Sequence, residues 1–257
     1  MDVAGHNKKS WDHYVESGNP WTIPVTPEQV EQARAGVWRI FLTPIKPIPE
    51  DWFPPLPGLD VLCLASGGGQ QGPILAAAGA VVTVFDNSPR QLARDKEVAE
   101  RDGLALTLVE GDMADLSCFS EGSFDLIINP VSNCFAPRLK GIWQEAARVL
   151  KPGGALLAGF VNPINYLFDG EKEKEGVFQL AHKMPYSDLS SITEEERVRL
   201  YGKESALEFG HSLDDQIGGQ IRAGLVISGF YEDYTPNEKI SEYMPTFIGT
   251  RASKLTQ

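Results

Sequence analysis

The stretch that decides the fold reads VLCLASGGGQQGPILAAAGAVVTVFD and covers residues 61–86. It joins a short apolar run, residues 61–64, to a glycine-rich turn and then to a helix-like run, residues 73–78. A second apolar run follows and ends at Asp86. Short apolar runs are typical of buried strands, and glycine reaches backbone conformations that are closed to other residues. This order of strand, turn, helix and strand predicts half of a βαβ unit.

The glycine turn and the acid beyond it predict a site for a ribose-bearing cofactor. Glycines let a ligand lie against bare backbone, and the helix that follows begins with unpaired N–H groups. An acid about 20 positions further on accepts hydrogen bonds from ribose hydroxyls. Asp86 lies 19 positions after Gly67 (86 − 67 = 19). The alternative is an ordinary tight turn of an α/β protein without a ligand.

The same residues resemble the first motif of the class I S-adenosylmethionine-dependent methyltransferases, V-L-D-x-G-x-G-x-G. Gly67 and Gly69 occupy two of the glycine positions. Cys63 stands where an acid is usual, and Ala65 replaces the first glycine. In the family that acid helps to hold the methionine end of the cofactor. The resemblance implies that the turn, with Ala65, Ser66, Gly67 and Gly69, binds S-adenosylmethionine.

A helix is expected directly after the second strand. Ser88 and Gln91 have the spacing of a capping box, and Pro89 occupies the first helical position, so the helix should run to about Arg101. Because the start of this helix follows the ribose-binding acid, we expect Asn87 and Gln91 to contact the cofactor as well.

The third strand, residues 106–109, ends in a loop that suits the adenine ring. This loop reads EGDM, residues 110–113. In the family, the acid of such a G-D-x sequence accepts a hydrogen bond from the adenine amino group, and the next backbone N–H meets the ring. The resemblance therefore implies these two roles for Asp112 and Met113. A polar loop without a ligand is the alternative.

The fourth strand, residues 123–128, opens into the loop at residues 129–135. Ligands bind at the carboxyl ends of strands in open α/β sheets. We therefore expect this loop to face the methyl group and the acceptor. Asn129 is predicted to contact the cofactor, while Ser132 and Asn133 are predicted to contact the acceptor.

The rest of the chain completes the fold that the resemblance implies. A helix is expected near residues 142–150, a helix stop and tight turn at residues 151–154, and a fifth strand at residues 155–161. Two further strands, residues 225–234 and 246–252, should form an antiparallel hairpin at the sheet edge. The predicted fold is a doubly wound, Rossmann-like α/β domain of seven strands with an antiparallel last strand.

Two segments lie outside this pattern. Residues 1–57 form an N-terminal extension with a short helix from Ser10, a capping box at Thr26 and many prolines. In the family such an extension folds over the cofactor, so Trp11 and Tyr14 either belong to a lid or pack the extension onto the domain. Within the methyltransferase domain, residues 58–257, an insertion at residues 162–210 is expected to shape the acceptor pocket.

Two more residues are predicted on the acceptor side. Tyr166 leaves the fifth strand on the side of the sheet where ligands bind. His211 precedes a helix at the expected pocket edge, and a histidine there could accept a proton from the acceptor as the methyl group arrives. The structural alternative for His211 is a helix-flanking histidine with a fixed hydrogen bond.

Composition narrows the partners. The chain has 257 residues, 42% of them hydrophobic, and a net charge of −12, which argues against a broad nucleic-acid or anionic-membrane surface. No apolar run reaches about 18 residues, and the N-terminus has no signal-peptide region. The three cysteines show no metal-binding spacing. We expect a cytoplasmic protein without a metal, acting on a small molecule; the sequence leaves its oligomeric state open.

The function predicted from the resemblance is methyl transfer from S-adenosylmethionine to a small-molecule acceptor, through an O, N or S atom. Two alternatives stay open. The glycine turn and Asp86 also suit an NAD(P)-dependent oxidoreductase, although residues 111–113 and the two final strands count against it. The changes at Cys63 and Ala65 also fit a non-catalytic S-adenosylmethionine-binding protein.

Overall fold

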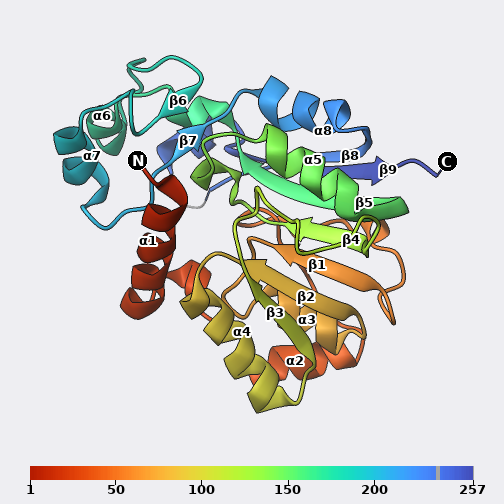
Figure 1. Ribbon diagram of the computed structural model, residues 1–257. Coiled ribbons are helices and arrows are strands. Elements are labelled where there is room, and N and C mark those ends of the chain that lie inside the picture. The colour runs from red at the N-terminus through yellow and green to blue at the C-terminus, as the bar shows by residue number, and fades with distance from the viewer. Residues whose placement is uncertain (236–237, 257) are drawn as a thin grey trace.

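The computed structural model describes residues 1–235 and 238–256 and is built around one central sheet. Seven strands lie in the order β3-β2-β1-β4-β5-β9-β8, as Figure 1 shows. The first five are parallel, and β9 runs antiparallel to both β5 and β8. The predicted doubly wound fold is thereby confirmed. The strands are β1 (Asp60–Leu64), β2 (Val81–Asp86), β3 (Leu106–Glu110), β4 (Phe124–Asn129), β5 (Leu150–Val161), β8 (Leu225–Asp233) and β9 (Phe247–Lys254).

Helices cover both faces of the sheet, which is why its strands read as continuous apolar runs. In β1, Val61 and Cys63 face one layer while Leu62 and Leu64 face the other, because side chains alternate along a strand. The first layer contains α2 (Pro27–Arg34), α3 (Gln71–Ala77) and α4 (Pro89–Asp102). The second contains α5 (Lys140–Val149), with α8 (Gly219–Arg222) packed beside it.

The first helix of the N-terminal extension and the insertion lie on the same side of the molecule. Figure 1 shows α1 (Val3–Ser17) reaching from α4 toward the insertion elements. The insertion contains α6 (Gly170–Lys174), α7 (Glu194–Tyr201) and a small sheet of β6 (Tyr186–Ser187) and β7 (Phe209–Gly210). Shorter helical turns are η1 (Pro20–Thr22), η2 (Glu50–Trp52), η3 (Asn133–Phe135), η4 (Pro163–Tyr166), η5 (Asp214–Gly218) and η6 (Lys239–Glu242). Within the described residues, no helix has the length and hydropathy needed to cross a bilayer.

Three predicted boundaries differ from the structure. The first helix begins at Val3 instead of Ser10, because the Asp2 side chain accepts a hydrogen bond from Gly5 N and caps it there. The turn expected at residues 151–154 lies inside β5, where pairing with β4 skips these residues at an irregularity. The helix expected after His211 is divided into a π-helical turn, η5, and the short α8.

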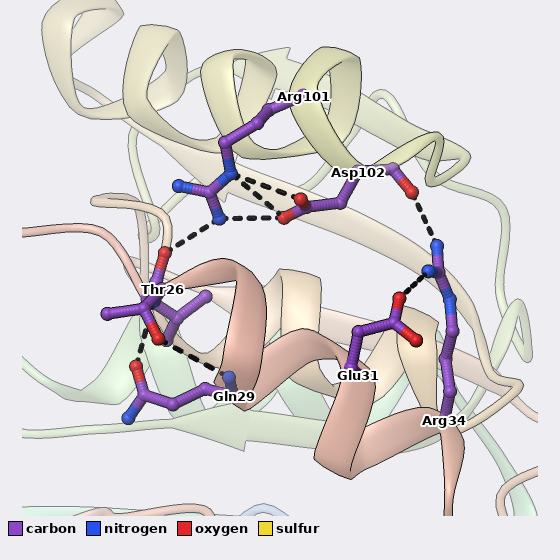
Figure 2. Close-up of polar contacts among 7 residues, drawn as sticks. Thr26, Gln29, Glu31, Arg34, Arg101 and Asp102 are labelled. Carbon is purple, nitrogen blue, oxygen red and sulfur yellow. Dashed lines mark hydrogen bonds and ion pairs between the residues drawn. The ribbon is translucent and has the colours of Figure 1, made fainter.

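The capping box at Thr26 is confirmed and begins α2, as Figure 2 shows. Thr26 N donates to Gln29 Oε1 at 2.9 Å, and Gln29 N donates to Thr26 Oγ1 at 3.3 Å. Two arginines then join α2 to the end of α4 (Figure 2). Arg101 donates to the Val25 carbonyl oxygen at 2.8 Å, and Arg34 donates to the carbonyl oxygen of the last α4 residue. The N-terminal extension is thus fastened to the sheet's first helical layer.

A second attachment holds the proline-rich segment that precedes β1. Asp233, at the end of β8, accepts hydrogen bonds on Oδ2 from Thr43 Oγ1 at 2.7 Å, Ile45 N at 2.9 Å and Lys46 N at 2.8 Å. The side chain is 3% exposed. Burial by itself raises the pKa of Asp233, but the hydrogen bonds outweigh burial and hold the pKa below its usual range.

We predict that Asp233→Ala lowers the free energy of unfolding by roughly 3 kcal/mol, because buried donors lose a charged acceptor. Chemical denaturation at neutral pH measures the loss. A lowered pKa means that this stabilisation is present above about pH 4 and is lost as the pH falls through the folded-state pKa, so the difference should shrink on acidification. The control is Asp214→Ala, which removes an exposed ion pair with Arg222. Equal stability of Asp233→Ala and the wild type would contradict this account of the attachment.

Candidate active site

A cavity of about 1780 Å³ opens at the carboxyl ends of the parallel strands. Loops after four neighbouring strands line it: residues 65–67 after β1, 85–87 at the end of β2, 111–114 after β3 and 130–132 after β4. The strand order reverses between β1 and β4, and ligands of doubly wound sheets bind at this switch point. A cavity therefore lies where the sequence predicted the site.

The side chains of two acidic residues accept hydrogen bonds from the backbone of the glycine turn. Gly67 N donates to Asp86 Oδ2, and Gly68 N donates to Asp95 Oδ2, both at 2.9 Å. A Cβ on Gly67 would lie 2.7 Å from the Gln91 Cβ and 3.1 Å from the Asp86 Cγ, so only glycine fits there. Ala65 has φ 47°, the left-handed conformation that explains why glycine is usual at its position.

Asp86 has the geometry expected of a ribose-binding acid. Its side chain is 8% exposed and lines the cavity. Besides Gly67 N on Oδ2, it accepts Ser88 N on Oδ1 at 2.9 Å. Burial raises the pKa of Asp86, and the backbone hydrogen bonds offset part of that rise. Each carboxylate oxygen can accept a further hydrogen bond, which leaves capacity for the hydroxyls of a ligand.

Gln91 does not complete the predicted capping box. Ser88 Oγ accepts Gln91 N at 3.1 Å, but Asp86 Oδ1 already accepts the backbone N–H of Ser88 that the Gln91 side chain would take. The Gln91 side chain lies instead beside the glycine turn, on the cavity wall, and is 4% exposed. Its Oε1 is buried without a hydrogen-bond partner among the described residues. A donor from a bound ligand would satisfy this oxygen.

Asp95 is a site residue that the sequence analysis missed. It is fully buried, and burial raises the pKa of its carboxyl to about 8, with the Gly69 and Gly68 N–H groups opposing the rise. Its position was readable in retrospect: Gln91 and Asp95 are four residues apart on α4, a spacing that places both on one helix face. This face of α4 packs against the glycine turn.

The predicted adenine and acceptor loops also border the cavity. Asp112 and Met113 line it, as does Ser132. Asp112 Oδ1 accepts Ala114 N at 2.9 Å, which closes the loop after β3 into a tight turn. Ser132 Oγ lies 3.8 Å from the Met113 sulfur, so the loops after β3 and β4 meet. Their predicted roles toward adenine and acceptor stay predictions.

Three predicted contact residues support the cavity from behind and do not line it. Asn129 is fully buried and donates through Nδ2 to Leu64 O at 3.0 Å and to Ser132 Oγ at 2.9 Å. Asn133, also buried, donates to Gln216 Oε1 at 3.2 Å. The Gly69 carbonyl oxygen accepts a hydrogen bond from Val25 N of the N-terminal extension. These contacts hold the loops that line the cavity, so direct ligand contact by the three residues is not what the geometry favours.

The two tyrosines predicted on the acceptor side are absent from the cavity lining in the described chain. The Tyr14 hydroxyl accepts Ala206 N at 3.0 Å, and Tyr166 donates to Glu208 Oε2 at 2.9 Å. Both hydroxyls therefore engage the insertion. Trp11 does line the cavity, with its ring edge-to-face against Tyr14.

His211 is not at the pocket rim, and that expectation is wrong. The side chain is 8% exposed and absent from the cavity lining, and its Nε2 lies 2.8 Å from the Ala136 carbonyl oxygen. A carbonyl only accepts, so Nε2 carries a proton and donates. Burial lowers the pKa of His211, and the Ala136 hydrogen bond opposes that change. The structural alternative, a histidine with a fixed hydrogen bond beside a helix, describes what is found.

The N-terminal extension supplies much of the opposite wall. Residues 1–4, 36–44 and most of 20–26 line the cavity. Val25 N donates to Gly69 O at 2.9 Å, so the extension lies directly against the glycine turn. Asn7 donates to Phe135 O at 2.9 Å and to Leu207 O at 3.1 Å, which ties α1 to the loop after β4 and to the insertion. Of the two extension residues predicted at the site, Trp11 lines the cavity and Tyr14 does not.

The sheet order, the glycine turn and the acid at the end of β2 define a class of protein, and comparison with known proteins agrees. This chain belongs to the class I S-adenosylmethionine-dependent methyltransferases. A family model described as a methyltransferase domain matches residues 62–158. An uncharacterized methyltransferase of Bacillus subtilis (strain 168), YbaJ, is 51% identical over 253 residues, which cover 98% of this chain and 99% of that protein.

Two further comparisons concern more distantly similar proteins. Sterol 24-C-methyltransferase ERG6A of Gibberella zeae is 39% identical over 100 residues, which cover 38% of this chain and 26% of that enzyme. A crystal structure of an S-adenosylmethionine-dependent methyltransferase from Mesorhizobium loti has a TM-score of 0.61 at 19% identity, with 79% of this chain and 94% of that chain covered. The latter shows a shared fold.

The residues present fit S-adenosylmethionine, the cofactor of this family. Gly67 leaves the turn backbone open to the cavity, Asp86 has acceptor capacity for hydroxyls, and Gln91 Oε1 lacks a partner. Cys63, at the usual position of an acid, lies buried in the core layer on the first face of the sheet. The buried acid beside the turn is Asp95 on α4, which accepts Gly68 N and does not line the cavity.

We predict that Asp86→Ala weakens S-adenosylmethionine binding at least about tenfold, because charge-assisted hydrogen bonds to ribose are lost. Titration calorimetry measures the affinity, and thermal unfolding checks that the variant is folded. The matched control is Asp115→Ala, an exposed carboxylate that caps a turn outside the cavity lining. Unchanged affinity in a folded Asp86→Ala protein would remove this residue from the cofactor site.

A second prediction concerns Asp95, whose carboxyl has a pKa of about 8 in the fold. The folded-state pKa is raised, so stabilisation by the protonated acid is present at low pH and is lost as the pH rises toward the folded-state value. The free energy of unfolding, measured with denaturant, should therefore fall between about pH 5 and about pH 9 in the wild type. The fall should be smaller in Asp95→Asn, because the amide does not titrate. Identical pH dependence of the two proteins would show that Asp95 is ionised throughout this range. Asp115→Asn serves as the exposed control.

Proposed function

We propose that this methyltransferase acts on a small-molecule acceptor. The observation that carries the proposal is that one cavity contains both the cofactor loops and a wall rich in aromatic side chains. Small-molecule sites usually enclose about 300–1,000 Å³ and are lined mainly by apolar and aromatic side chains. A volume of about 1780 Å³ leaves room for an acceptor beside the cofactor. The aromatic residues outside the cofactor loops are Trp11, Trp21, Trp38, Phe41, Phe135 and Phe247.

The position of the N-terminal extension supports a small acceptor over a polymer. Residues from the extension line the cavity opposite the strand ends, with α1 fastened by Asn7 and the residue 20–26 segment fastened at Gly69. These segments restrict access from that side. A net charge of −12 also disfavours a nucleic-acid acceptor, because phosphates would be repelled.

The chemistry assigned to the chain is binding, orientation and exclusion of water. When bound, S-adenosylmethionine supplies a methyl group on a positively charged sulfonium. In residues 1–235 and 238–256, no histidine, cysteine, lysine or tyrosine lines the cavity. Among the side chains of the described lining residues, a proton released by the acceptor could pass only to the carboxylates of Asp2, Glu50, Asp86 or Asp112, or else to solvent. The aromatic wall would align the acceptor. Exclusion of water by that wall strengthens each electrostatic contact inside.

The proposal is tested with S-adenosylmethionine that carries a tritiated methyl group. Purified enzyme is incubated with a cell extract divided by dialysis into small molecules and macromolecules. We expect label to accumulate in small molecules with wild-type enzyme and not with Asp86→Ala. Label in RNA or protein alone would overturn the small-molecule proposal. Binding of the cofactor without label transfer to any fraction would favour the alternative of a non-catalytic binding protein.

A further inference from the structure

The arginines of this chain divide into two groups. All eleven lie in the described part of the chain, and nine of them hold an ion pair or a side-chain hydrogen bond. Arg39 and Arg138 have neither within residues 1–235 and 238–256. Both line the active-site cavity, which none of the nine paired arginines does in the described structure. The arginines without a protein partner are thus the ones that line the cavity, and both are exposed residues.

The two arginines line the cavity from segments that lie far apart in sequence but are joined by a backbone hydrogen bond. Arg39 belongs to the stretch between α2 and η2, and Arg138 lies between η3 and α5. Val131 N donates to Leu42 O at 3.1 Å, so the segment that carries Arg39 lies against the loop that leads toward Arg138. Arg39 and Arg138 thus belong to two segments that contact each other and that both line the cavity.

Charge makes this arrangement informative. The chain has 35 acidic and 23 basic residues, so carboxylate partners are plentiful. Nevertheless, no acid lies within ion-pair distance of either arginine in the described structure. Of the acids that line the cavity, Asp86 and Asp112 belong to the cofactor loops, and Asp2 caps α1. Glu50 also lines the cavity.

The chemistry of the guanidinium group indicates which ligand group would pair with these arginines. Its planar set of donors matches a carboxylate or a phosphate, and such pairs are stronger than neutral hydrogen bonds. Trp38 and Ile40 flank Arg39 in the chain, Pro137 precedes Arg138, and these apolar neighbours also line the cavity. An apolar surface strengthens a charge pair formed next to it. A ligand complementary to this part of the cavity combines an apolar body with an anionic group.

We propose that the acceptor is an apolar small molecule with an anionic head group, a carboxylate or a phosphate, which Arg39 and Arg138 bind. The apolar body lies along the aromatic side chains, and the head group anchors it relative to the cofactor loops. This inference rests on the proposed function and specifies its substrate class.

The test uses decanoate, decyl phosphate and decanol, which share one apolar chain and differ in the head group. Calorimetry is performed on the full-length protein saturated with S-adenosylhomocysteine. We expect the better of the two anions to bind at least about tenfold more tightly than decanol, because hydrogen bonds to a charged group are gained. Comparison of decanoate with decyl phosphate distinguishes the two head groups.

Three variants assign the effect to residues. Arg39→Gln and Arg138→Gln remove the charge and keep a hydrogen-bonding side chain, and each should reduce the preference for the anion about fivefold or more. Arg199→Gln is the matched control, because Arg199 is an exposed arginine on α7 that pairs with Glu171. Affinity for S-adenosylhomocysteine should be the same in all four proteins.

The outcomes separate the two proposals. Binding of S-adenosylhomocysteine together with equal binding of anions and decanol, or with no binding of any of the three, would overturn the inference and leave the proposed function standing. An anion preference that survives both cavity substitutions would also overturn it, since the arginines would then not bind the head group. Failure of the wild-type protein to bind S-adenosylhomocysteine would contradict the proposed function itself.

Discussion

The active site depends on buried carboxylates that hold the glycine turn. Asp86 and Asp95 accept the N–H groups of Gly67 and Gly68, and both acids are largely shielded from water. Removing a carboxylate from water is costly, and it is tolerated where hydrogen bonds or protonation compensate. Here β2 supplies one acid and α4 the other, so the turn can keep its shape only when strand and helix are packed together. The conformation of the glycine turn therefore depends on the packing of the core.

The cavity wall formed by the N-terminal extension depends on a different set of attachments. Asp233 binds the segment around Thr43, and Gly159 lets the Leu42 backbone approach β5, where a Cβ would meet the Leu42 carbonyl oxygen at 2.3 Å. Asn7 fastens α1 to the loop after β4 and to the insertion. One side of the cavity is therefore built by parallel strand ends and the other by an extension fastened through buried polar contacts.

The two capping boxes show where reading a sequence succeeds and where it fails. The Thr26 box forms as predicted because its exposed groups have no competing partners nearby. The box at Ser88 forms only halfway, because Asp86 takes the N–H that the Gln91 side chain was expected to bind. Gln91 is thereby left with a buried oxygen on the cavity wall. A local rule fails at this position because the site imposes a second demand on the same residues.

The sequence by itself determined the strand, glycine turn and helix that lead to Asp86, because apolar runs, turn chemistry and helix caps act over a few residues, while the seven-stranded sheet followed from the family resemblance. It also predicted that residues 111–113 follow a strand end beside the site. Only the tertiary structure decided that Asp95 lies beside the turn, that His211 donates to the Ala136 carbonyl oxygen, and that Arg39 lines the cavity. These three outcomes rest on contacts between segments far apart along the chain, which burial and backbone hydrogen bonding select only when the whole domain is packed.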